Sequence, residues 1–263
     1  MIVPQALQFE TGSATHIGMV REVNEDNHLV GADHGIWLIA DGMGGHKNGR
    51  LASATVVKAV ESVGSAASAP DLFARFKDRI GRANAELLTL AEGDGNAVMG
   101  ATVAALLVFG GHFACVWSGD SRIYRVRDGA ISQLSKDHTE VQELIDRGAI
   151  KPEEAKSWPR RNVVTRAVGV FEDPALEVVQ GELRPGDTFV LCSDGLTGHV
   201  EDDEILHHVW RSPPQQACES LIRLTLERGA QDNVTVIVVN CQEDDRTVPA
   251  LIGERAPASG GPG

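Results

Sequence analysis

The stretch IWLIADGMGGHKNG, residues 36–49, passes from an apolar run through Asp41 into a cluster of glycines. Residues 36–40 are typical of a buried strand. Asp and Gly are also ordinary turn residues, so this stretch alone predicts only a strand that ends in a turn. It becomes informative because three other apolar runs also meet an aspartate at one end.

Those three runs are FACVWSG before Asp120, FVLCS before Asp194, and NVTVIVV after Asp232. If the four ends meet at one edge of packed sheets, the like charges raise one another's pKa and resist desolvation. Divalent cations would relieve this repulsion, and all-oxygen ligands favour Mg²⁺, Mn²⁺ or Ca²⁺ over zinc or copper. The alternative is four separate, exposed turn aspartates, and the spacing alone does not decide between the two.

A basic residue lies upstream in GMVREVNEDN, residues 18–27, where Arg21 precedes the acidic pair Glu25 and Asp26. An arginine near a metal–carboxylate cluster can hold a phosphate oxygen, because its planar fork matches that geometry. The alternative is a surface ion pair between Arg21 and Glu25.

The composition is that of a globular protein, with 263 residues, 42% of them hydrophobic, and a formal net charge of -13. This length fits one large domain or two small ones. The negative charge makes nucleic acid and anionic membranes poor partners. The same excess of carboxylates is also what cation binding would require.

The cysteines are scattered and form no CxxC pair, which argues against a thiolate zinc site. We expect reduced cysteines in the core of a cytoplasmic protein. The N-terminus lacks the pattern of a signal peptide, and the longest apolar run, residues 99–111, is too short to cross a bilayer.

Periodicity predicts helices and strands in an order that suits antiparallel sheets covered by helices, not a strictly alternating parallel fold. The expected helices span about 48–63, 71–91, 201–210 and 214–228. The expected strands fall within 15–18, 27–32, 36–40, 100–119, 121–134, 162–169, 176–183, 187–193 and 233–240. A tight hairpin turn is expected at Asp128-Gly129, and a turn with Pro second and Gly third at residues 184–187.

Two segments differ from the rest in composition. Residues 135–162 are charged with short helical pieces, and we interpret them as a small insertion placed against the sheets. Residues 242–263 are polar and rich in Pro, Gly and Ala, which predicts a disordered tail after a single domain of residues 1–241.

Eight motifs in order give the sequence a specific resemblance: THIGMVREVNED, ADGMGGH, ATVAALL, SGDSRIYRVRDG, LSKDHTEVQELIDRGAI, NVVTRAVG, LCSDGL and DNVTVIVV. Over about residues 10–241 the chain resembles the bacterial branch of the PPM-type, or type 2C, metal-dependent Ser/Thr protein phosphatases. The resemblance implies an α+β fold of two packed antiparallel sheets flanked by helices on both sides, an αββα sandwich. The insertion at 135–162 corresponds to the family's flap beside a metal channel.

The resemblance also implies a set of metal ligands for two or three Mn²⁺ or Mg²⁺ ions. Asp41 would bridge two metals, and the carbonyl of Gly42 would help to hold the second. Asp194 and Asp232 would complete the first metal's protein ligands, while Glu25 would support the second through water.

Further positions carry over in the same way. Asp120 matches the residue that shares a third metal with Asp194, and Arg21 matches the phosphate-binding arginine. Many eukaryotic relatives carry a histidine where this chain has Met43. His46 follows three residues later, as in bacterial relatives, and its role as acid, phosphate contact or helix cap stays open. His138, in KDHT, is expected to be a substrate-side or structural residue.

The implied activity is hydrolysis of phosphoserine and phosphothreonine in proteins by a metal-activated water that attacks phosphorus in line with the departing oxygen. The enzyme would act as a monomer and would reverse a bacterial Ser/Thr kinase, with that kinase and its substrates as partners. No cysteine nucleophile is needed, and Cys192 is assigned to core packing. The alternatives are an inactive phosphoprotein-binding scaffold of the same fold and a narrower phosphatase of anti-sigma antagonists.

Overall fold

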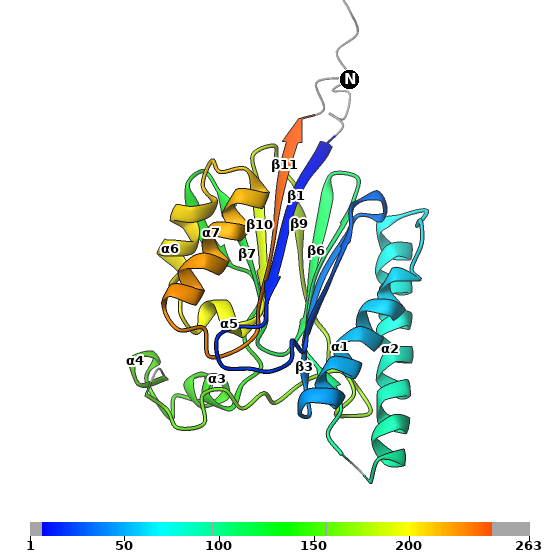
Figure 1. Ribbon diagram of the computed structural model, residues 1–263. Helices are drawn as coiled ribbons and strands as arrows, with labels where there is room; N and C mark the ends of the chain where they lie inside the picture. Colours follow the sequence, from blue (N-terminus) through cyan, green and yellow to red (C-terminus); the bar gives the residue numbers. More distant parts are fainter. Residues whose placement is uncertain (1–6, 96, 156, 244–263) are drawn as a thin grey trace, which may run out of the picture.

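Two antiparallel sheets pack face to face, and helices cover the outer face of each sheet (Figure 1). The structure is a computed structural model that describes residues 7–95, 97–155 and 157–243. This arrangement of four layers confirms the predicted αββα sandwich.

The first sheet has the strand order β1-β11-β10-β7-β8 and the second the order β2-β3-β5-β6-β9, with β4 paired to β3. The strands are β1 (Leu7–His16), β2 (Asp26–Gly31), β3 (Ile36–Met43), β4 (Gly100–Ala101), β5 (Val103–Phe109), β6 (His112–Ser118), β7 (Arg122–Arg127), β8 (Ala130–Gln133), β9 (Glu177–Glu182), β10 (Thr188–Cys192) and β11 (Val234–Glu243).

Helices α1 and α2 cover the second sheet, while α5, α6 and α7 cover the first (Figure 1). The helices are η1 (Ala32–His34), α1 (His46–Glu61), α2 (Ala69–Gly93), α3 (Glu140–Asp146), α4 (Pro152–Ala155), α5 (Asp194–Thr197), α6 (Asp202–Val209) and α7 (Pro214–Glu227). The short helices α3 and α4 lie within the segment 135–162 that the sequence singles out.

The alternation along β3 determines where its acidic residue lies. Leu38 and Ala40 pack toward α1 and α2, whereas Trp37 and Ile39 lie in the core between the two sheets. Because side chains of a strand alternate between its two faces, Asp41 lies on the same inner face as Trp37 and Ile39. The strand therefore delivers a carboxylate to the end of the space between the sheets.

Both predicted turns are present. Asp128 and Gly129 have φ angles of 53° and 78°, which is the backbone that a tight primed turn between β7 and β8 requires. In the second turn the N–H of Asp187 donates to the carbonyl of Arg184 at 3.0 Å, and Gly186 has a φ of 89°. Glycine suits that third position because L side chains rarely adopt a positive φ.

The strand predicted at 162–169 is wrong. In this segment only two isolated bridges form, between Val164 and Thr139 and between Val168 and Ala101. The segment connects the flap to the second sheet instead of joining a ladder, and the N–H of Thr165 donates to a carbonyl at the other end of the flap, that of His138.

The chain ends of the domain differ slightly from the expected ones. β1 begins at Leu7, earlier than the predicted strand at 15–18, and β11 continues to Glu243, two residues beyond the predicted boundary at 241. Residues 244–263, most of the predicted tail, lie outside the described residues.

All four cysteines, Cys115, Cys192, Cys218 and Cys241, are buried and unbridged, as expected. Burial raises the pKa of the Cys192 thiol to about 12, which agrees with its assignment to core packing. Within the described ranges, none of the helices combines the length and the hydropathy that a membrane span needs.

Candidate active site

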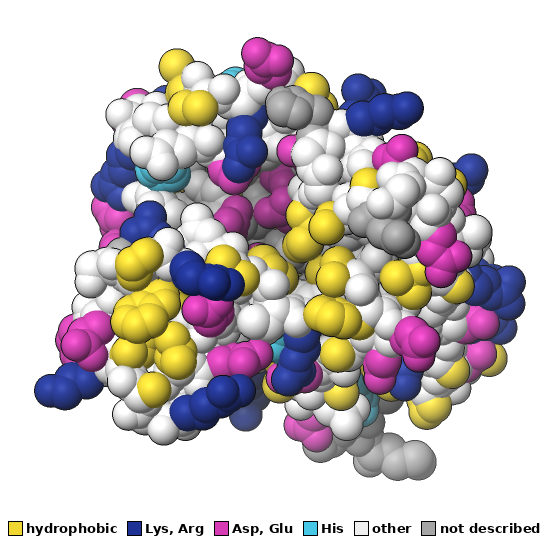
Figure 2. All heavy atoms as spheres, turned by 90° about the horizontal axis from the view of Figure 1, so that it is seen from below, with side chains coloured by type: hydrophobic (Ala, Val, Ile, Leu, Met, Phe, Trp, Pro, Cys, Tyr) yellow, Lys and Arg dark blue, Asp and Glu magenta, His cyan; other side chains and the backbone are white. Residues whose placement is uncertain are grey.

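A cleft of about 850 Å³ opens at the end of the sandwich where β3 delivers Asp41, between the sheet loops and the flap. Figure 2 looks onto this end of the molecule and shows a hollow with acidic side chains inside it. The polar side chains that line the cleft include Arg21, Asp120, Arg122, Asp137, Thr139, Arg161, Asp194, Glu201 and Asp232.

Four of the predicted aspartates reach this region from different connections. Asp41 lies near the end of β3, and Asp120 lies between β6 and β7. Asp194 is the first residue of α5, directly after β10, and Asp232 lies just before β11. Asp41 and Asp194 lie close enough to influence each other's ionisation, so strand ends far apart in the sequence do meet at one rim.

The gathered carboxylates raise one another's pKa. Burial raises the pKa of Asp41 well above its usual range, and the neighbouring carboxylates, Asp26 first among them, raise it further. Burial and then Asp232 raise the pKa of Asp194 to about 6. Burial and then Asp194 also raise the pKa of Asp120. Ionising these carboxylates without a counter-ion is therefore unfavourable.

Asp26 belongs to this cluster although the sequence predicted no role for it. Its Oδ2 accepts hydrogen bonds from Ser193 Oγ at 2.8 Å and from Thr235 Oγ1 at 2.7 Å. Its Oδ1 is buried and has no hydrogen-bond partner among the described residues. Burial raises the pKa of Asp26 to about 7. The sequence showed the adjacent acidic pair Glu25-Asp26. It did not show at which residue β2 begins, and therefore which of the two carboxylates faces inward.

Glu25 and Gly42 lie together beside α1. The N–H of Gly42 donates to the carbonyl of Glu25 at 3.2 Å. A Cβ on Gly49 would overlap Oε1 of Glu25 and would lie 2.8 Å from the carbonyl oxygen of Gly42. Two oxygens thus converge on a glycine of the helix, in a space that a larger residue would fill.

Arg21 lines the cleft from the β1–β2 connection and forms an ion pair with Asp232, with 2.6 Å between Nη2 and Oδ2. Asp232 raises the pKa of Arg21, and Glu25 adds a smaller attraction. The Arg21 side chain keeps 47% of its surface exposed, so the guanidinium is accessible to a ligand in the cleft.

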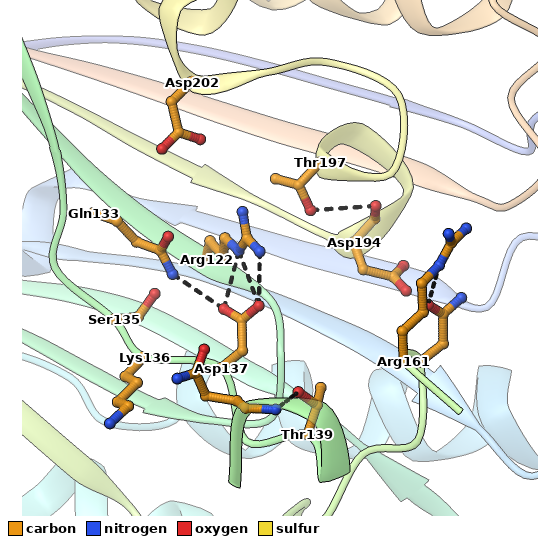
Figure 3. Close-up of polar contacts among 12 residues, drawn as sticks. Arg122, Gln133, Ser135, Lys136, Asp137, Thr139, Arg161, Asp194, Thr197 and Asp202 are labelled. Carbon is orange, nitrogen blue, oxygen red and sulfur yellow. Dashed lines mark hydrogen bonds and ion pairs between the residues drawn. The ribbon is translucent and has the colours of Figure 1, made fainter. Parts of the chain in front are cut away.

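Two further cleft residues were not predicted. Arg122 donates to both carboxylate oxygens of Asp137, at 2.9 and 3.1 Å from Nε and 2.8 Å from Nη2 (Figure 3). They are 15 positions apart, and no local pattern links them.

His46 is the first residue of α1, and its side chain lies outside the described part of the structure.

The donor set fits hard divalent cations in its chemistry. Every candidate donor is an oxygen, several carboxylates are buried close together, and Asp26 Oδ1 is a buried acceptor without a partner in the described residues. Among the described side chains, no group of three His, Cys, Asp or Glu is already arranged around an ion position.

The chain is similar to known protein phosphatases over most of its length. It is 38% identical over 240 residues to the serine/threonine protein phosphatase PstP of Mycobacterium tuberculosis. That match covers 90% of this chain and 46% of PstP, so the chain spans about half the length of this relative.

Solved structures give the same result. A structure of PppA, a regulatory component of the type VI secretion system in Pseudomonas aeruginosa, matches with a TM-score of 0.83 and 39% identity, covering 89% of this chain and 97% of that one. The catalytic domain of PstP in complex with two manganese ions matches with a TM-score of 0.82 and 35% identity, covering 90% and 100%. The family model described as protein phosphatase 2C matches residues 15–226, and the chain therefore belongs to the protein phosphatase 2C family.

Proposed function

We propose that this chain is a metal-dependent phosphatase that hydrolyses phosphoserine and phosphothreonine in proteins. The observation that carries the proposal is the gathering of five aspartates at one end of the sandwich, close enough to perturb one another's ionisation: Asp26, Asp41, Asp120, Asp194 and Asp232. The name of PstP as a serine/threonine protein phosphatase, and its solved complex with two manganese ions, support the same activity.

The residues that would hold Mn²⁺ or Mg²⁺ are the carboxylates of Asp41, Asp120, Asp194 and Asp232, with Glu25 and the carbonyl of Gly42 on the side of α1. When bound, such cations activate water and offset the charge of a phosphate. The repulsion among the buried carboxylates supports this assignment, because it is the cations that would make such crowding tolerable.

Arg21 has the task of binding the phosphate. Its guanidinium lies at the cleft beside Asp232, with nearly half of the side chain exposed. A forked cation at this position can hold phosphate oxygens and orient the phosphorus toward the carboxylate cluster.

The substrate class follows from the cleft and from the relatives. A surface cleft of about 850 Å³ accommodates a phosphorylated side chain together with flanking peptide. We infer that the substrates are proteins phosphorylated on serine or threonine, in line with the name of PstP, and that a bacterial Ser/Thr kinase that phosphorylates them is a partner.

Hydrolysis of a phosphothreonine peptide tests the proposal, with Mn²⁺ or with EDTA, for the wild type and for Asp194→Asn. Phosphate release should require both Mn²⁺ and Asp194, with a loss on the order of 100-fold or more in the variant, the scale seen when one preorganised charge-stabilising group is removed. Binding of the peptide without hydrolysis in Mn²⁺ would instead favour an inactive scaffold.

A further inference from the structure

The turn that carries Asp120 is held in one conformation. β6 ends at Ser118 and β7 begins at Arg122, and Asp120 between them is 7% exposed. Gly119 has a φ of +114°, and a Cβ there would lie 2.6 Å from the Cβ and Cγ2 atoms of Thr102. Only glycine fits this position, because a side chain would meet both the positive φ and the close contact with Thr102.

His138, at the start of the flap, binds both backbone polar groups of Gly119. The N–H of Gly119 donates to Nδ1 of His138 at 3.1 Å. The N–H of His138 donates to the carbonyl of Gly119 at 2.9 Å. His138 thus holds both backbone polar groups of Gly119, the residue before Asp120, with one side-chain bond and one backbone bond.

The imidazole of His138 is itself fixed. It is 6% exposed and stacks on Trp117, with ring centroids 6.2 Å apart and planes 25° apart. Because Nδ1 accepts from Gly119, the proton of the neutral ring lies on Nε2, which is 3.2 Å from Oε1 of Glu177. Burial and the nearby Arg166 lower the pKa of His138, which favours this neutral form.

The residue before His138 holds the other side of the turn. Asp137 accepts the three hydrogen bonds from Arg122, two positions after Asp120 (Figure 3). Asp137 and His138 therefore fix Arg122 and Gly119, the residues on either side of Asp120 and Ser121. The start of the flap therefore holds both ends of the connection between β6 and β7, which carries Asp120.

We propose that His138 is a positioning residue that orients Asp120 for cation binding beside Asp194. The proposal rests on the proposed function, because it assumes that Asp120 takes part in holding a divalent cation. His138 would touch neither the cation nor the substrate and would act through the backbone of Gly119. Partners of this kind contribute about 10- to 100-fold to metal affinity in other metal sites.

Two substitutions separate the effect of the hydrogen bond between Gly119 and Nδ1 of His138 from the effect of the packing of the imidazole ring. In His138→Asn, the amide oxygen can take the place of Nδ1 and accept from Gly119. In His138→Gln, the longer side chain reaches the place of Nε2 and offers no acceptor to Gly119. Both variants lose the stack on Trp117, so a loss that comes only from packing should be similar in the two.

The measurement is calorimetric titration of the metal-free full chain with Mn²⁺, with Asp120→Asn defining the binding step that depends on this carboxylate. His138→Gln should weaken that step by about 10-fold or more, and His138→Asn by less than about threefold. The double variant Asp120→Asn, His138→Gln should bind no more weakly than Asp120→Asn alone, because the effect of His138 passes through Asp120.

Several results would overturn the proposal: equal loss in the two His138 variants, additive losses in the double variant, or an Asp120→Asn variant that binds Mn²⁺ like the wild type. The titration measures binding and not hydrolysis. A wild type that binds Mn²⁺ but releases no phosphate would therefore refute the proposed function and still leave the role of His138 decided by the variants.

Discussion

Asp26 and Asp41 are direct cross-strand partners at the paired ends of β2 and β3. Like charges directly opposite each other on neighbouring strands destabilise a sheet. Here both residues are also half-buried, and Asp26 is the leading electrostatic cause of the raised pKa of Asp41. A cation bound beside these two carboxylates would offset their repulsion. The pairing therefore predicts that removing one of the charges stabilises the metal-free protein and weakens metal binding.

Asp26→Asn should stabilise the metal-free protein and weaken its response to metal. The amide keeps an oxygen that can accept from Ser193 and Thr235, while the negative charge opposite Asp41 is lost. We expect the Tm in EDTA to rise by about 2–4 °C, the change that corresponds to about 1 kcal/mol in a domain of this size. The Mn²⁺ concentration for half-maximal activity should rise about 10-fold, as for other groups that support metal ligands.

Thermal unfolding in EDTA and a Mn²⁺ titration of phosphate release check this prediction. Glu86→Gln, an exposed substitution on α2, is the control and should leave both quantities nearly unchanged. A lower Tm for Asp26→Asn in EDTA would show that its hydrogen bonds outweigh the repulsion.

The stability of the metal-free protein should fall as the pH rises. The pKa of Asp26 is raised from 3.8 to about 7 and that of Asp194 from 3.8 to about 6, chiefly by burial. A carboxyl group with a higher pKa in the folded state contributes stability that is complete below about pH 4. That contribution is lost as the pH rises through the folded-state pKa.

The Tm in EDTA should therefore decrease as the pH rises from 5, most steeply below about pH 6, where the folded state still holds protons that the unfolded state has lost, and it should level off above about pH 7. Saturating Mn²⁺ should reduce the decrease, because a cation that binds the ionised carboxylates favours the folded state at high pH. Scanning fluorimetry over this range measures both. A Tm in EDTA that climbs from pH 5 to pH 8 would contradict the shifts.

The order of the predicted elements favoured antiparallel sheets covered by helices, whereas the resemblance to a phosphatase family implied the sandwich and the metal ligands. The spacing of the aspartates alone did not decide whether they meet. Side chains of β3 alternate between its two faces up to Asp41, but residues 36–40 are all apolar, so only the structure shows which face lies between the sheets. Local patterns do not show the phase at which a strand begins, so the inward position of Asp26 was missed. The contact of Arg122 with Asp137 joins a strand to the flap and depends on tertiary packing. The segment 162–169 looks like a strand, but its backbone groups are used to close the flap.

Arg21→Ala should weaken substrate binding more than it slows turnover. Arg21 is accessible in the cleft and paired with Asp232, so its loss removes a forked donor for phosphate oxygens. Hydrogen bonds to charged groups contribute about 1.5–3 kcal/mol, which corresponds to a decrease of roughly 10- to 100-fold in kcat/KM. Most of the decrease should come from KM.

Steady-state kinetics with a phosphothreonine peptide check this prediction. Arg82→Ala is the matched control, because Arg82 is an exposed arginine of α2 that forms an ion pair with Asp78 outside the cleft. An Arg21→Ala enzyme with wild-type KM and kcat would remove Arg21 from the site.

Gly49→Ala should destabilise the protein although alanine is the better helix former. Gly49 and Gly81 both lie within helices, α1 and α2, where replacing glycine by alanine usually stabilises by about 1 kcal/mol. A Cβ on Gly81 meets nothing within 4 Å, so Gly81→Ala should raise the Tm. A Cβ on Gly49 would overlap Oε1 of Glu25 and crowd the carbonyl of Gly42.

Gly49→Ala must therefore displace Glu25 or tilt the start of α1. We expect a Tm several degrees lower, at roughly 2–4 °C per kcal/mol, together with a higher Mn²⁺ requirement, because the two displaced oxygens belong to the proposed metal site. Gly81→Ala should leave the Mn²⁺ requirement unchanged while raising the Tm. If both alanine variants were stabilised and activated equally by Mn²⁺, the close approach of α1 to Glu25 and Gly42 would have no part in holding the cation.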